Sequence, residues 1–192
     1  MNFYIWIGGY KEGFCVINRP DVSGLRKLKK GVSLISDFPD DAACVMNPEF
    51  PKDIQLADYL YGAGIPVISL RLKEILEKKV LDNRVEYLPL RIINHKGRVA
   101  SHDYFIVNPM DVCDCIDTDK SGVRWNQITS NLISGCNGLV LKNEAIPEGY
   151  KLFRLKYWGS KVLVRSGLVE TLNAADLTGL DFRNTEGYTG IG

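Results

Sequence analysis

The sequence lacks a hydrophobic run long enough to cross a lipid bilayer, which takes about 18 consecutive apolar residues. The apolar stretch near the N-terminus, Phe3–Ile7, stops at Gly8-Gly9. No basic segment precedes this stretch and no small-residue cleavage site follows it, so it does not match a secretory leader. We therefore expect a cytoplasmic protein with no membrane partner, and we interpret Phe3–Ile7 as a first strand.

The sequence also lacks an excess of either charge. It has 24 basic and 23 acidic residues, which gives a formal net charge of +1. This balance provides no general attraction to nucleic acid or to anionic lipid, so we expect no nucleic-acid partner. A hydrophobic content of 45% and a charged content of 24% are ordinary for a globular protein. A specific protein partner is compatible with all of these values.

Histidines are scarce, and the cysteines form no recognisable framework. An odd number of cysteines outside a small secreted scaffold favours reduced thiols. Cys113 and Cys115 are too close for the Cys-x2-Cys of a zinc knuckle, and only His95 and His102 are present to complete such a site. We therefore expect small buried thiols, no metal and no cofactor. The cysteines are Cys15, Cys44, Cys113, Cys115 and Cys136.

The motifs of common catalytic sites are missing as well. The sequence has no Gly-rich phosphate loop, nucleophile elbow or paired zinc-ligand motif. A nucleophilic mechanism would need a thiol or the Ser121 hydroxyl beside His95 or His102. Both histidines fall where the chain is predicted to turn between two strands. We therefore expect turn residues there, and a protein that is not an enzyme.

One segment matches half of a calcium-binding loop. Asp117–Gly122 has oxygen-bearing residues at positions 1, 3 and 5 and glycine at position 6, but position 12 is Ile128 instead of a bidentate glutamate. This mismatch favours an acidic turn whose Asp and Ser side chains bond the local backbone.

Apolar periodicity and capping residues predict the secondary structure. The strongest helix follows Ser69, because Leu72, Ile75 and Leu76 recur at helical spacing. Pro89 should place its strand at an edge or a bulge. The other expected elements are a hairpin of Phe3–Ile7 with Phe14–Ile17, a short helix at Asp53–Tyr61, and strands at Val85–Ile93 and Tyr104–Val107.

The C-terminal segment predicts two strands, a short helix and a return to extended chain. The strands are Leu152–Lys156 and Lys161–Arg165, and Ser166 is expected to cap the helix that follows. Gly179 is expected to supply the left-handed exit that ends this helix, before Leu180–Phe182. These elements together predict an α+β fold, with an antiparallel or mixed sheet flanked by a few short helices.

The order of these landmarks resembles that of the Imm11 immunity proteins of bacterial polymorphic toxin systems. Besides the C-terminal ending, the resemblance rests on Tyr104–Ser121, in which an aromatic strand runs into Asn108-Pro109, then aspartates and a serine. Phe38-Pro39 and the helix after Ser69 are similar to earlier family landmarks. The resemblance covers about residues 36–182. We therefore divide the chain into N-terminal strands at residues 1–35, packed on or continuous with an immunity-like domain at residues 36–192.

The resemblance implies a function as well as a fold. Members of this family bind and neutralise a toxin made by the same bacterium, so the implied partner is a cognate toxin encoded nearby and the implied action is stoichiometric. This activity would protect the producing cell and its kin and would need no cofactor. Two alternatives stay open. One is a regulatory or housekeeping binding module unrelated to toxin, with a calcium response through Asp117–Gly122 as one version of it, and the other is a Cys/His-dependent hydrolase.

Four carboxylates are the candidate partner-binding residues. They lie close together in a chain that is otherwise nearly neutral, and an acidic loop would suit a toxin with a basic cleft. Strand alternation prevents all four from sharing one face, which favours the last two. A solvated turn is the alternative, and the basic run Arg26–Lys30 is the next candidate contact. The four residues are Asp111, Asp114, Asp117 and Asp119.

Overall fold

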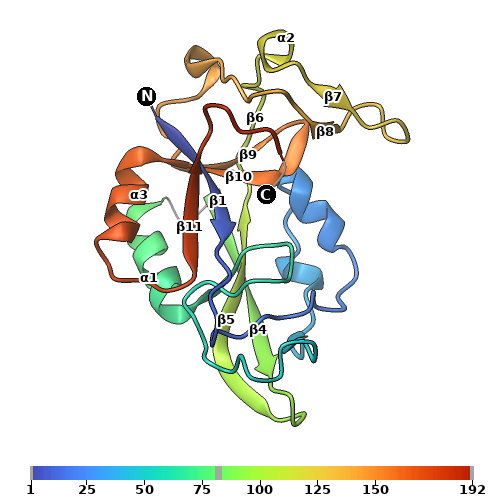
Figure 1. The fold of residues 1–192 in the computed structure, drawn as a ribbon, viewed down its shortest axis with the longest axis vertical. Helices are drawn as coiled ribbons and strands as arrows, with labels where there is room; N and C mark the ends of the chain where they lie inside the picture. The colour runs from blue at the N-terminus through green and yellow to red at the C-terminus, as the bar shows by residue number, and fades with distance from the viewer. Residues whose placement is uncertain (1, 81–83, 191–192) are drawn as a thin grey trace.

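The computed structural model describes residues 2–80 and 84–190, and in this part of the chain the strands form two larger sheets and one small pair (Figure 1). The five-stranded sheet has the order β11-β1-β10-β9-β6, and the four-stranded sheet has the order β2-β4-β5-β3. The first contains β1 (Phe3–Gly8), β6 (Val112–Cys113), β9 (Leu152–Leu155), β10 (Trp158–Arg165) and β11 (Leu180–Asn184). The second contains β2 (Ala43–Val45), β3 (Val67–Ser69), β4 (Val85–Ile93) and β5 (Val99–Pro109).

The four-stranded sheet is built on the long β4–β5 hairpin, which confirms the two strands predicted there. Pro89 is opposite Phe105 of β5, whereas β2 pairs with β4 only at Arg91–Ile93. Pro89 therefore lies where β4 is locally an edge strand, as its missing N–H requires.

Two helices contribute to one apolar cluster, one of them against the four-stranded sheet and the other against the five-stranded sheet. In α1 (Leu70–Lys79) the Ser69 hydroxyl accepts the N–H of Leu72, which confirms the predicted cap. This helix buries Leu72 and Leu76, and α3 (Ser166–Asn173) buries three apolar residues in the same cluster. Figure 1 shows the two helices on one flank of the molecule. The shorter elements are η1 (Leu25–Lys30), η2 (Ile35–Asp37), α2 (Thr118–Ser121), β7 (Arg124–Trp125), β8 (Ile133–Gly135) and η4 (Asn143–Ala145).

The predicted N-terminal hairpin does not form. β1 pairs instead with β10 on one side and β11 on the other, both antiparallel, so strands from the C-terminal part of the chain occupy its two edges. Phe14 and Val16 make isolated bridges to Gln55 and Tyr61. A domain boundary after residue 35 stays a prediction.

The predicted helix at 53–61 is wrong too. The backbone there bonds outward: Gln55 donates to the carbonyl of Gly13 and accepts from Cys15, and Tyr61 accepts from Ile17. Extended pairing with a distant segment has replaced the local hydrogen bonds that a helix would have used, which is tertiary context overriding local propensity.

Two details of the predicted C-terminal helix are also wrong. Its N-cap is Arg165, and Ser166 is the first helical residue, whose N–H donates to the carbonyl of Asn2. The helix ends at Asn173, well before Gly179. Gly179 does adopt a left-handed conformation, with φ +78°, but outside the helix. Glycine is needed there because a Cβ would also collide with the carbonyl oxygen of Tyr59. Glycine here permits a close approach of two backbone segments.

The observed architecture confirms the α+β class, with mixed sheets and few short helices. The buried apolar side chains of the described residues form three clusters, one of them shared by the two helices. No helix in residues 2–80 and 84–190 has the length and apolarity needed to span a membrane.

Candidate partner-binding surface

Three of the four predicted contact residues are paired with cations, two of them with cations from distant parts of the chain. Arg84 Nη1 lies 2.7 Å from Asp111 Oδ2, and Lys156 Nζ lies 2.8 Å from Asp114 Oδ2. Both cations also stack on aromatic rings, Arg84 on Tyr150 and Lys156 on Tyr157. The net negative charge that these two carboxylates present to a partner is therefore small.

The other two carboxylates belong to one turn, residues 117–122, which we call the acidic turn. Asp117 is the N-cap of α2 and accepts the N–H of Lys120 at 3.1 Å. This hydrogen bond lowers the pKa of Asp117, so the cap is charged at neutral pH, and Lys120 Nζ lies 3.3 Å from its Oδ2 as an ion pair within the turn. The bond from Lys120 confirms the predicted local backbone bonding for Asp117, whereas the Ser121 hydroxyl accepts the N–H of Val140, 19 residues away, so that part of the prediction is wrong. Asp119 is exposed, and in the described chain its carboxylate has no hydrogen bond or ion pair.

A hairpin that the sequence prediction missed projects beside the acidic turn. It comprises β7, β8 and the turn between them, residues 124–135, and we call it the finger. Figure 1 shows the finger and α2 at one end of the molecule, opposite the β4–β5 turn. Ile128 at the tip is 96% exposed, and Trp125 and Leu132 are exposed as well. The available sequence signal was the absence of any Asp, Glu, Lys or Arg from residues 125–141.

The tip of the finger is held by its own hydrogen bonds. Asn126 Oδ1 accepts the N–H groups of Ile128 and Thr129, both at 2.9 Å. The Asn126 N–H donates to the carbonyl of Leu132, whose own N–H donates to the carbonyl of Thr129. These bonds fix the backbone that carries the exposed isoleucine, so the tip is a structured turn.

The finger and the acidic region are connected at the finger's base. The Trp125 ring packs edge-on against Tyr157 with 5.7 Å between centroids, and the Tyr157 hydroxyl donates to Asp114. Arg124 donates to the side chain of Asn137, whose N–H donates to the carbonyl of Ser121 in the acidic turn. The acidic turn and the finger together form one candidate surface, with charge on the turn and apolar groups on the finger.

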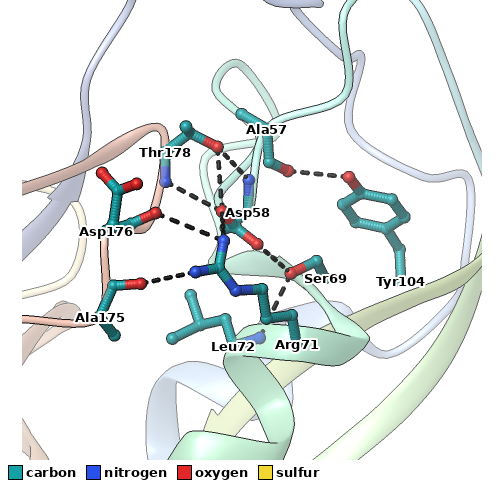
Figure 2. Close-up of polar contacts among 9 residues, drawn as sticks. All are labelled: Ala57, Asp58, Ser69, Arg71, Leu72, Tyr104, Ala175, Asp176 and Thr178. Carbon is teal, nitrogen blue, oxygen red and sulfur yellow. Dashed lines mark hydrogen bonds and ion pairs between the residues drawn. The ribbon is translucent and has the colours of Figure 1, made fainter.

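A buried carboxylate, Asp58, ties distant parts of the chain together (Figure 2). It accepts hydrogen bonds from the Ser69 hydroxyl at 2.8 Å and from the N–H and hydroxyl of Thr178 at 2.9 and 3.0 Å. Arg71 lies 3.7 Å from it and donates to the carbonyls of Ala175 and Asp176. The network joins the start of α1 to the segment after α3. Its bonds are internal, so its role is to hold the fold.

A cleft of about 750 Å³ lies at the C-terminal end of β1. Its wall includes Tyr10, whose ring contacts those of Phe50 and Tyr61 with centroid distances of 5.8 and 6.1 Å. The Tyr10 hydroxyl donates to Asp53, and this hydrogen bond raises the pKa of Tyr10. A second hollow of about 370 Å³ lies between Asn2-Phe3 and residues 184–186.

The residues that a thiol- or histidine-dependent hydrolase would need are not together. His95 and His102 belong to the β4–β5 hairpin near its turn, at the opposite end of the molecule from α2 and the finger (Figure 1). Cys113 and Cys115 are buried in an apolar cluster, and burial raises the pKa of both thiols. All five cysteines are buried, as predicted. In the described ranges no group of three or more His, Cys, Asp or Glu residues is placed to hold a metal ion.

A model of the immunity protein family Imm11 matches residues 15–187 of this chain. The chain belongs to the Imm11 family. The match contains the segment 36–182 on which the resemblance rested and begins further upstream, within the N-terminal region that had contributed little to it. A comparison with curated proteins returned no match.

Membership in Imm11 decides the class of protein. Immunity proteins of this family are typically non-catalytic, in agreement with the prediction that the chain is not an enzyme. The family also implies a toxin-neutralising role, with a cognate toxin as partner.

Proposed function

We propose that this Imm11 protein binds a cognate toxin in the cytoplasm and neutralises it one to one, protecting the producing cell and its kin. The observation that carries the proposal is the family match over residues 15–187. A stoichiometric inhibitor requires a stable surface complementary to its target and no catalytic group. The ordered surface formed by the acidic turn and the finger supports the proposal.

The acidic residues are proposed to contact the toxin, with Asp119 and Asp117 ahead of Asp111 and Asp114. Asp119 is exposed and has no cation partner among the described residues, and Asp117 is paired only with Lys120 of the same exposed turn. Asp111 and Asp114 are instead each paired with a cation from another part of the chain. Charge complementarity of this kind speeds the encounter of two proteins more than it strengthens the final complex. A toxin that acts on nucleic acid or a phosphorylated cofactor would supply the basic partner surface.

The test is co-expression with the toxin gene adjacent to the gene for this chain. Cells carrying the toxin alone should stop growing, and cells carrying both genes should grow and yield a complex that co-purifies. A toxin with its active site disabled, expressed with the same immunity protein, gives the complex without selection for survival. Growth arrest in the presence of abundant, folded immunity protein would contradict the proposal.

A further inference from the structure

We propose that the finger is the anchor of the toxin complex, and that Ile128 enters an uncharged, apolar pocket on the toxin. This inference rests on the proposed function and adds to it the element that holds the two proteins together. It assigns the acidic turn and the finger to different stages of binding.

The first argument is the exposure of Ile128. A side chain that is 96% exposed contributes almost nothing to the fold, and an isoleucine left in water gives up the free energy that its burial would provide. Exposed isoleucines elsewhere on the protein keep more contact with it, as Ile35 does at 63% exposure. Trp125 and Leu132 add exposed apolar surface, so the same hairpin carries three exposed apolar side chains.

The second argument is that the tip is already ordered. The side chain of Asn126 holds the N–H groups of Ile128 and Thr129, and the backbone pairing of Asn126 with Leu132 closes the turn. A loop that is ordered before binding loses little conformational entropy in the complex, and this smaller entropic cost makes the binding tighter. Amide and hydroxyl groups around an aromatic and an aliphatic anchor are also the composition of many natural binding loops.

The third argument concerns the chemistry of the partner. Residues 125–141 carry no charged side chain, although 24% of the whole chain is charged. An uncharged tip can be buried without the cost of removing a charge from water, so the matching pocket on the toxin is neutral and apolar. Asp119 and Lys120 are exposed on α2, at the same end of the molecule as the finger, and would meet the polar rim of that pocket (Figure 1).

The two parts of the surface then have separable kinetic roles. Exposed charge on the acidic turn mainly affects the association rate and its dependence on salt. Packing of a desolvated apolar anchor mainly affects the dissociation rate, which accounts for most differences in affinity among variants of one interface. Ile128 should therefore behave as a hot spot of the interface.

The experiment measures binding of the purified chain to the cognate toxin with its active site disabled, by surface plasmon resonance. Ile128→Asp should weaken the complex by about a hundredfold through faster dissociation, as expected for loss of a hot spot. Ile35→Asp places the same substitution on η2, at another exposed isoleucine, and should leave both rate constants unchanged. Circular dichroism of each variant should match that of the unaltered chain, because neither side chain is buried.

The outcomes separate this inference from the function on which it rests. Tight binding by both the unaltered chain and Ile128→Asp would overturn the finger as anchor and leave the proposed function standing. Failure of the unaltered chain to bind the toxin would overturn the proposed function and the anchor with it. Sedimentation of the isolated chain gives a third check, since a dimer that dissociates in Ile128→Asp would assign the finger to a second copy of the chain and overturn the inference.

Discussion

Asp58 and Thr178 bind each other reciprocally across 120 residues of sequence. The Asp58 N–H donates to the Thr178 hydroxyl oxygen, and the N–H and hydroxyl of Thr178 donate to the Asp58 carboxylate (Figure 2). The contact holds the segment before β3 against the segment after α3. Because β11 follows directly, this pair also helps to position the strand that borders β1.

The first prediction is that Asp58→Ala destabilises the fold. The substitution leaves the N–H and hydroxyl of Thr178 and the hydroxyl of Ser69 without their acceptor, a loss that should cost about 1–3 kcal/mol of unfolding free energy. Urea unfolding followed by tryptophan fluorescence measures it. Asp40→Ala, at an exposed position, is the matched control and should change stability by no more than about 0.5 kcal/mol. Equal stability of the two variants would show that the network contributes little.

A second prediction concerns Gly179. Alanine there would need φ near +78° and would collide with the carbonyl oxygen of Tyr59, so Gly179→Ala should cost more than about 1 kcal/mol. Gly149→Ala is the control, because a Cβ at Gly149 meets no atom within 4 Å. Thermal unfolding of both variants compares the positions, and a Gly179→Ala protein as stable as the control would contradict the close approach described for this turn.

A third prediction concerns alkaline pH. Burial raises the pKa of Cys15 from 9.0 to about 11 and that of Cys44 from 9.0 to about 12. The folded state holds the neutral thiols, so their contribution to stability is fully present below pH 9 and is lost as pH rises toward 11–12. We expect unfolding free energy to fall over this range, and iodoacetamide at pH 8 to label the thiols of the native protein far more slowly than those of the denatured chain. Rapid labelling of the native protein, followed by mass spectrometry, would contradict their burial.

A fourth prediction separates electrostatic steering from anchoring. Asp117→Lys with Asp119→Lys should slow association with the toxin by about tenfold at low salt, and the difference should shrink as salt screens the charges. Asp119→Lys alone tests the same effect without disturbing the cap of α2, because Asp117 provides that cap. Stopped-flow measurements at two salt concentrations give the rates. Unchanged association in both variants would exclude the acidic turn as the steering element and direct the search to Arg26–Lys30.

Local features of the sequence were sufficient for some elements. The helix after Ser69 was predicted correctly because its cap and its apolar spacing lie within a few residues of one another. The strand at Phe3–Ile7 was also correct, but its partners were not, since pairing with β10 and β11 depends on residues more than 150 positions away. The segment 53–61 has an acceptable helical pattern, yet it is extended because Gly13–Ile17 supplies its hydrogen bonds.

The candidate surface was only partly visible in the sequence. The acidic residues stand out by composition, but the neutralisation of Asp111 depends on Arg84, which is 27 positions away. The finger left a signal in the uncharged run at 125–141, although nothing local indicates that Ile128 points outward instead of into the core. Asp58 gave no signal, because its most distant partner is at position 178.

The central claim is that this Imm11 protein inhibits its toxin by forming a one-to-one complex. The most direct measurement is isothermal titration calorimetry of the full chain into the cognate toxin with its active site disabled. The account predicts a stoichiometry of one and a dissociation constant on the order of nanomolar or tighter, equivalent to about −12 kcal/mol. Binding that is only micromolar, or protection of active toxin by a small catalytic fraction of this protein, would contradict it.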